Sequence, residues 1–128
     1  MAIDEIEKNF YDSEALFGMA RLRKRRSRLP MNLYLDDSGS YLNGGHGPRI
    51  KFQTDKSDSA NTGAMLPMTI SEQPEIPVKN YRSQLDGISE SDLQRLREFV
   101  ITNRVNLLRL CDKDDDYDIQ EFMNDMIL

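Results

Sequence analysis

Residues 89–111 form the longest segment in which apolar side chains recur at helical spacing, and this segment constrains the fold more than any other. Ser89 is a favourable N-cap residue, and the Asp92 carboxylate three residues later can bond back to the start of the helix. The segment predicts one helix of about 22 residues, about 33 Å long, which is enough to cross a small sheet. Its apolar stripe is expected to consist of Leu93, Leu96, Val100, Leu107 and Cys111, widened by Phe99, Ile101, Leu108 and Leu110.

Three segments upstream of this helix alternate apolar and polar residues, as half-buried strands do. They are residues 31–35, 49–53 and 66–70, and residues 76–78, which contain one proline and follow another closely, are expected to add a short fourth strand at the edge. The predicted class is therefore α+β, with a three- to four-stranded antiparallel sheet covered by one long helix. The side chains expected to face that helix are Met31, Leu33, Leu35, Ile50, Phe52, Leu66, Met68 and Ile70, whereas Arg49, Lys51 and Gln53 are expected to face outward.

The length of 128 residues favours one main domain, preceded by a distinct N-terminal segment. We expect residues 1–28 to be a helical arm that ends in a basic block, and residues 29–128 to be a single α+β domain. Apolar residues at helical spacing in residues 3–10 and 16–19 suggest that the arm is helical. A short C-terminal helix is expected to begin at Asp118, with Glu121 in the capping-box position.

The sequence indicates a cytoplasmic protein without a membrane segment. Its longest apolar runs fall well short of the roughly 18 residues that a spanning helix needs, and the acidic residues 1–10 do not resemble a signal peptide. The single cysteine, Cys111, excludes an internal disulfide framework and fits a reducing compartment. Because Cys111 falls on the apolar stripe of the long helix, it is expected to be a core residue.

Charge is distributed in blocks along the chain, although the net charge is only −5. Residues 1–20 carry five carboxylates against one lysine, and residues 112–125 carry seven carboxylates against one lysine. Between them, residues 21–28 carry six positive charges in eight positions: Arg21, Arg23, Lys24, Arg25, Arg26 and Arg28. Two interpretations of this basic block stay open. It can bind phosphate groups and release counterions, or it can pair with acidic residues of this chain or of a neighbour.

The acidic residues 112–118 between two predicted helices match part of a calcium-binding EF-hand loop. However, Tyr117 stands where such a loop requires glycine for its sharp turn, and Met123 stands where it requires a bidentate glutamate. An acidic linker with an aspartate cap is the better interpretation, and neither a metal nor another cofactor is expected.

No recognisable catalytic arrangement is present in the sequence. His46 is the only histidine. A metal centre with several histidine ligands is therefore excluded, and a Ser-His-Asp triad has no second candidate histidine. The chain is therefore not expected to be an enzyme.

Residues 46–52, which read His46-Gly-Pro48-Arg49-Ile-Lys51-Phe, resemble the signature of a family of small bacterial domains of unknown function. The family pattern is histidine, any residue, two prolines, histidine, aliphatic, histidine, aliphatic. The resemblance extends over about residues 31–111 and implies a short strand meander closed by a helix, encoded beside toxin–antitoxin-like or mobile-element genes. Arg49 and Lys51 replace the two strand histidines, so no metal or acid–base role of that pair carries over.

Two functions follow from these features. The first is a non-catalytic binding or regulatory module of a bacterial or phage mobile element that acts through protein contacts, and a second copy of the chain, held by the apolar arm, is one such partner. The alternative is a nucleic-acid-associated protein that uses the basic block. For either, the candidate binding residues are Arg21, Arg23, Lys24, Arg25, Arg26, Arg28, His46, Arg49 and Lys51.

Overall fold

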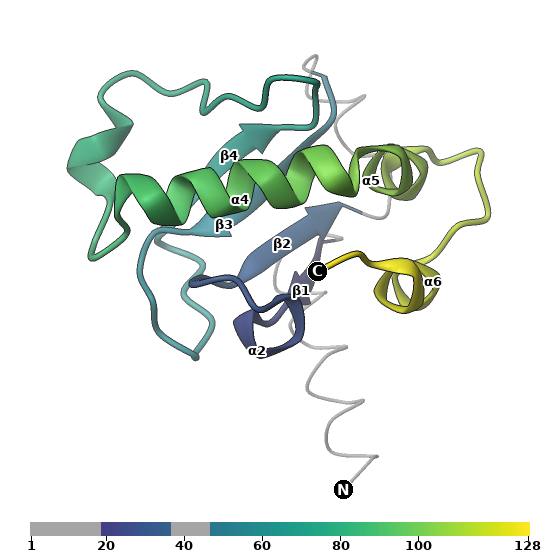
Figure 1. Cartoon of the computed structure of the whole chain (residues 1–128), viewed down its shortest axis with the longest axis horizontal. Coiled ribbons are helices and arrows are strands. Elements are labelled where there is room, and N and C mark those ends of the chain that lie inside the picture. The colour runs from purple at the N-terminus through teal and green to yellow at the C-terminus, as the bar shows by residue number, and fades with distance from the viewer. Residues whose placement is uncertain (1–18, 37–46) are drawn as a thin grey trace, which may run out of the picture.

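The computed structural model describes residues 19–36 and 47–128, and these form an antiparallel sheet followed by C-terminal helices. The predicted α+β class is therefore confirmed. Helix α4 lies across one face of the sheet, with α5 and α6 near one end of it (Figure 1). The strands, in their spatial order, are β1 (Met19–Leu22), β2 (Leu33–Asp36), β3 (Arg49–Gln53) and β4 (Met65–Thr69).

The fourth strand of the sheet is β1, and not the predicted strand at residues 76–78. Met19, which was predicted to be helical, pairs with Asp36 at one end of β1, and Leu22 pairs with Leu33 at the other. Residues 76–78 form no strand, because a proline within them and another just before them remove backbone donors. The rest of the predicted arm, residues 1–18, lies outside the described residues.

The core forms between one face of the sheet and the helices, as predicted. All eight side chains expected to face the helix are buried, and they belong to one cluster with the helix residues Leu93, Leu96, Val100 and Leu107. Cys111 is also buried in this cluster, which confirms its predicted core position. Gln53 corrects the prediction that it faces solvent, because its side chain is fully buried.

The predicted long helix is two helices, α4 (Glu90–Thr102) and α5 (Arg104–Cys111). The Ser89–Asp92 capping box forms at the start of α4 as expected. Asn103 leaves the helical conformation, with φ of −102° and ψ of 15°, and the chain changes direction there (Figure 1). Ile101, two residues before Asn103 in α4, is 47% exposed, so it does not widen the buried stripe as predicted.

The C-terminal helix α6 (Ile119–Asp125) begins at the predicted Asp118–Glu121 capping box. The acidic linker before it is held by Arg109, whose guanidinium pairs with Asp115 at 3.0 Å and lies 4.1 Å from the centre of the Tyr117 ring. The Tyr117 hydroxyl donates to Asp125 at 2.8 Å. Burial, followed by this bond to a carboxylate, raises the pKa of Tyr117 to about 12. No helix in the described part of the chain is long and apolar enough to cross a membrane.

Candidate functional site

The structure divides the basic block between two elements and a turn. Arg21 lies on β1, Arg23 is the N-cap of the short helix α2 (Lys24–Ser27), and Arg28 follows that helix. Lys24, Arg25 and Arg26 lie within α2 itself. The block is therefore neither a continuous helix nor a linker between elements. Its six basic side chains lie in different parts of the fold.

The pairing of the strands places Arg21 of β1 in line with Lys51 of β3, which is another of the predicted binding residues. Arg21 pairs with Tyr34, and Tyr34 pairs with Lys51, so the three form one row across the sheet. Because neighbouring residues of a strand point to opposite faces, and Leu22 and Phe52 lie in the core, this row lies on the face opposite to α4. Arg49 lies on that face as well, two residues before Lys51, and both are half-buried. His46 lies outside the described residues.

A buried polar cluster, which the sequence did not reveal, extends this second face of the sheet. It consists of Asn32, Tyr34 and Gln53, all fully buried. The Gln53 side-chain oxygen accepts from the Tyr34 hydroxyl at 2.5 Å and from the backbone N–H of Asn61 at 3.1 Å. Its amide nitrogen donates to Asp55 at 2.6 Å and to the Ser59 carbonyl at 3.0 Å. Gln53 thus fixes the loop of residues 55–61 against the sheet.

Bonds to the same cluster stabilise the charged form of Asp55. The Gln53 amide and, less strongly, the Asn61 amide and the Ser57 N–H hold the pKa of Asp55 below its usual value. Every strong donor and acceptor of Gln53 is used within the chain. Gln53 therefore has a structural role, since it holds the loop against the sheet.

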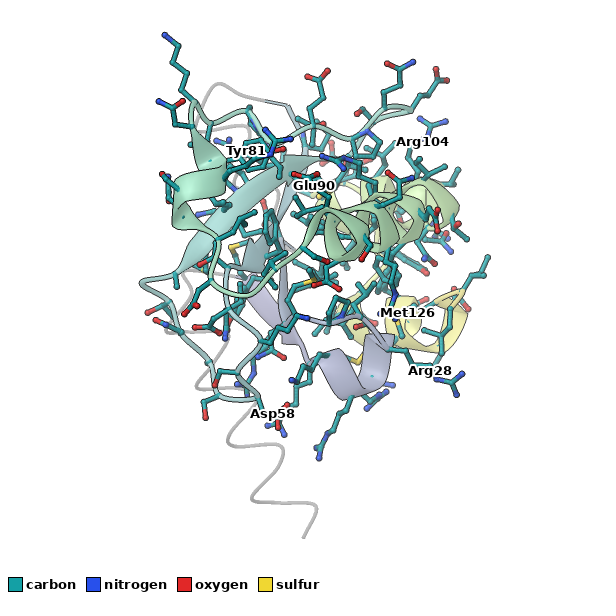
Figure 2. The ribbon with its side chains drawn as sticks, turned by 60° about the vertical axis from the view of Figure 1, so that its left-hand side comes forward. Arg28, Asp58, Tyr81, Glu90, Arg104 and Met126 are labelled. Atoms are coloured by element: carbon teal, nitrogen blue, oxygen red, sulfur yellow. The ribbon has the colours of Figure 1, made fainter. Side chains whose placement is uncertain are left out.

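Two basic residues of α2 are occupied by contacts within the chain. The Lys24 ammonium pairs with Asp58 at 3.1 Å, and an Arg26 guanidinium nitrogen lies 3.8 Å from the Met123 sulfur on α6. The basic block was open to two interpretations, phosphate binding and pairing with acidic residues, and Lys24 pairs with an acidic residue of this chain. Arg25 and Arg28 are exposed, and neither has an ion-pair partner in the described part of the chain. In Figure 2, Arg28 lies on the side of the molecule that also carries Met126, and Asp58 lies apart from both.

A groove of about 330 Å³ opens beside Arg28, and we call it the α2–α4 groove. Its walls come from the end of α2 with the two residues after it, from residues 95–102 of α4, and from residues 127 and 128. The lining residues are Ser27, Arg28, Leu29, Arg95, Glu98, Phe99, Thr102, Ile127 and Leu128. The groove therefore combines apolar walls with two guanidinium groups and one carboxylate side chain.

Two polar contacts set the shape of this groove. An Arg95 guanidinium nitrogen donates to the Arg28 carbonyl at 2.6 Å, and Arg28 has a left-handed backbone with φ of 63°. The Asn103 amide donates to the Ile127 carbonyl at 2.9 Å and accepts from the Ile127 N–H at 2.8 Å. Asn103 thus ends α4 and also positions the third wall. Sequence reasoning missed the groove because its walls lie far apart in the chain.

Comparisons with known proteins gave no relatives: no family model, no curated protein and no solved structure matches this chain. Within residues 19–36 and 47–128, histidine, cysteine, aspartate and glutamate side chains form no group of three or more that could hold a metal ion.

The acidic linker that matches part of an EF-hand loop forms hydrogen bonds within itself. The carboxylates of Asp112 and Asp115 accept hydrogen bonds from the backbone N–H groups of Asp114 and Tyr117.

Proposed function

We propose that this chain is a non-catalytic binding module that acts through contacts with another protein. The observation that carries the proposal is the α2–α4 groove, where Ile127 and Leu128 are 55% and 60% exposed beside Arg28 and Arg95. Exposed apolar side chains that lie together and are rimmed by polar groups mark protein interaction sites. A volume of about 330 Å³ is at the lower end of the range of ligand pockets, about 300–1,000 Å³, which suits one or two side chains of a partner.

The distribution of the basic block supports protein contacts over nucleic-acid binding. A phosphate-binding surface needs several free cations that follow a backbone. Here Lys24 is paired with Asp58, and Arg21 belongs to the opposite face of the sheet from α4. Glu98 among the groove residues would also repel a phosphate.

Nucleic-acid binding is the second candidate function, and it is favoured by the exposed Arg25, Arg26 and Arg28 on one short helix and its turn. It requires that affinity fall steeply with salt concentration. A mobile-element or phage context, which the resemblance implies, and a second copy of the chain as partner stay predictions.

Photo-crosslinking in the native host tests the proposed function. A photoreactive phenylalanine analogue at Thr102, an exposed residue of the groove, should yield a covalent product with one partner protein after irradiation. The matched control carries the same analogue at Gln84, which is exposed and lies before the N-terminal end of α4. A product at both positions, or at neither, contradicts a binding role of the groove. Salt-sensitive binding to oligonucleotides, together with no product at Thr102, would support the second candidate.

A further inference from the structure

The α2–α4 groove carries more positive than negative side-chain charge, and one of its cations has no partner in the described part of the chain. Arg28 and Arg95 line the groove together with a single carboxylate side chain, that of Glu98. Arg28 makes no ion pair with any described residue, and its side chain is exposed. Arg95 uses one nitrogen on the Arg28 carbonyl, which leaves further donors of its guanidinium for a ligand.

Apolar side chains lie next to these cations. Leu29 and Phe99 are largely buried at the groove, whereas Ile127 and Leu128 are more than half exposed. A ligand that covers the exposed apolar surface of Ile127 and Leu128 removes it from water and gains free energy. A purely charged ligand, such as a phosphate group alone, would leave this surface uncovered.

We propose that the groove binds a segment of a partner protein that carries an apolar side chain beside a carboxylate. The apolar side chain packs on Phe99 and Ile127, and the carboxylate accepts hydrogen bonds from Arg28 and Arg95. Guanidinium groups suit this role because their N–H groups match both oxygens of a carboxylate. The inference rests on the proposed function and specifies the chemistry of the partner.

Fluorescence anisotropy with three labelled peptides tests this specificity on the full chain. One probe alternates leucine with glutamate, the second alternates leucine with lysine, and the third alternates serine with glutamate. Only the leucine–glutamate probe should bind well. Its affinity should decrease only modestly with salt, because apolar contacts contribute much of it.

Two charge-removing variants of the same basic block separate the groove from general electrostatics. Arg28→Asn removes the guanidinium that has no ion-pair partner among residues 19–36 and 47–128, and asparagine tolerates the left-handed backbone of that position, so the fold is kept. It should weaken binding of the leucine–glutamate probe about tenfold, as the loss of a charge-assisted hydrogen bond does. Arg25→Gln removes the same charge from α2 outside the groove lining and should change the affinity less than about twofold. Glu98→Gln should strengthen binding, because it removes a like charge from the site.

The outcomes distinguish this inference from the proposed function. Equal loss of affinity in the Arg25 and Arg28 variants, or equal binding of the lysine and glutamate probes, overturns the inference. If Thr102 still crosslinks to a partner in that case, the binding role stands and only the partner chemistry is wrong. If light scattering instead shows a dimer that Arg28→Asn dissociates, a second copy fills the groove, and the inference is overturned as well.

Discussion

Replacing Gln53 by methionine removes the hydrogen-bonding centre of the loop 55–61 and keeps the length of the side chain. Gln53 is fully buried and makes four bonds of 3.1 Å or shorter, to Tyr34, Asp55, Ser59 and Asn61. The alternation in the sequence predicts that Gln53 faces outward from β3. Because its side chain is buried instead, replacing it should lower the free energy of unfolding far more than replacing an outward-facing polar residue would.

The expected loss of stability follows from which partners water can reach. Asn61 and Ser59 are exposed, so losing Gln53 costs about 0.5–1.5 kcal/mol for each of their bonds. The Tyr34 residue is fully buried, and a buried hydroxyl that loses this partner costs about 1–3 kcal/mol. Burial of the methionine side chain offsets part of this sum. We therefore expect Gln53→Met to lower the free energy of unfolding by about 2–4 kcal/mol, a large share of the about 5–15 kcal/mol of a typical domain.

Urea unfolding followed by far-ultraviolet circular dichroism measures this loss. Tyr34→Phe, alone and combined with Gln53→Met, completes a double-mutant cycle. Removing the hydroxyl should destabilise the native chain and cost much less once Gln53 is gone. A Gln53→Met variant within about 0.5 kcal/mol of the native chain, the usual range of surface substitutions, would refute the argument. So would a Tyr34→Phe cost that is equal in both backgrounds.

The same variant should change the titration of Asp55. Its pKa is lowered chiefly by the Gln53 amide, so this carboxylate stabilises the fold above its ordinary value near 3.8. The stabilisation is lost as the pH falls through the lowered pKa of the folded state. In Gln53→Met, nuclear magnetic resonance should show the Asp55 pKa moving up toward 3.8, and less stability should be lost on acidification. An unchanged Asp55 pKa would contradict the assigned cause.

Three further predictions concern the core, the groove wall and the C-terminal helix. Phe52→Ala should lower the free energy of unfolding by about 3–5 kcal/mol, because Phe52 is fully buried between the sheet and the helices; an unchanged melting temperature would contradict the core. Asn103→Ala should speed hydrogen exchange of the Ile127 amide, which it binds at 2.8 Å, and lower stability by about 1–3 kcal/mol; unchanged exchange would show that Asn103 does not hold the tail. Tyr117 should titrate near pH 12, so the stability that its protonated form contributes is complete below about pH 10 and lost as the pH rises through 12. Asp125→Asn should lower that pKa, and a Tyr117 pKa near 10 in the native chain would contradict the burial of this ring.

Much of the core could be predicted because burial on one side leaves a periodic pattern. Residues 31–35, 49–53 and 66–70 alternate, and the side chains predicted to face inward are buried. The helix caps at Ser89 and Asp118 were predictable because they depend on residues only three positions apart. Patterns of this kind are local and do not depend on which segments meet in the fold.

The features that were missed depend on contacts between distant segments. β1 has the alternation of a strand in Ala20, Arg21 and Leu22, but the surrounding cations suggested an exposed block. Asn103 interrupts a stripe whose apolar spacing continues into α5, and its side chain is held by Ile127, 24 positions later. Gln53 is polar at an outward position, and only the loop that folds over it makes it buried. The α2–α4 groove could not be predicted for the same reason.

The central claim is that the α2–α4 groove is the binding site, and a nuclear magnetic resonance titration tests it most directly. The leucine–glutamate peptide is added to the isotopically labelled full chain, and the amide and methyl signals that shift are assigned. We predict that the shifts gather at Leu29, Phe99 and Ile127, and that Arg28→Asn reduces them. Shifts that gather instead at Arg49 and Lys51 on the opposite face of the sheet, with the groove signals unchanged, would contradict the claim.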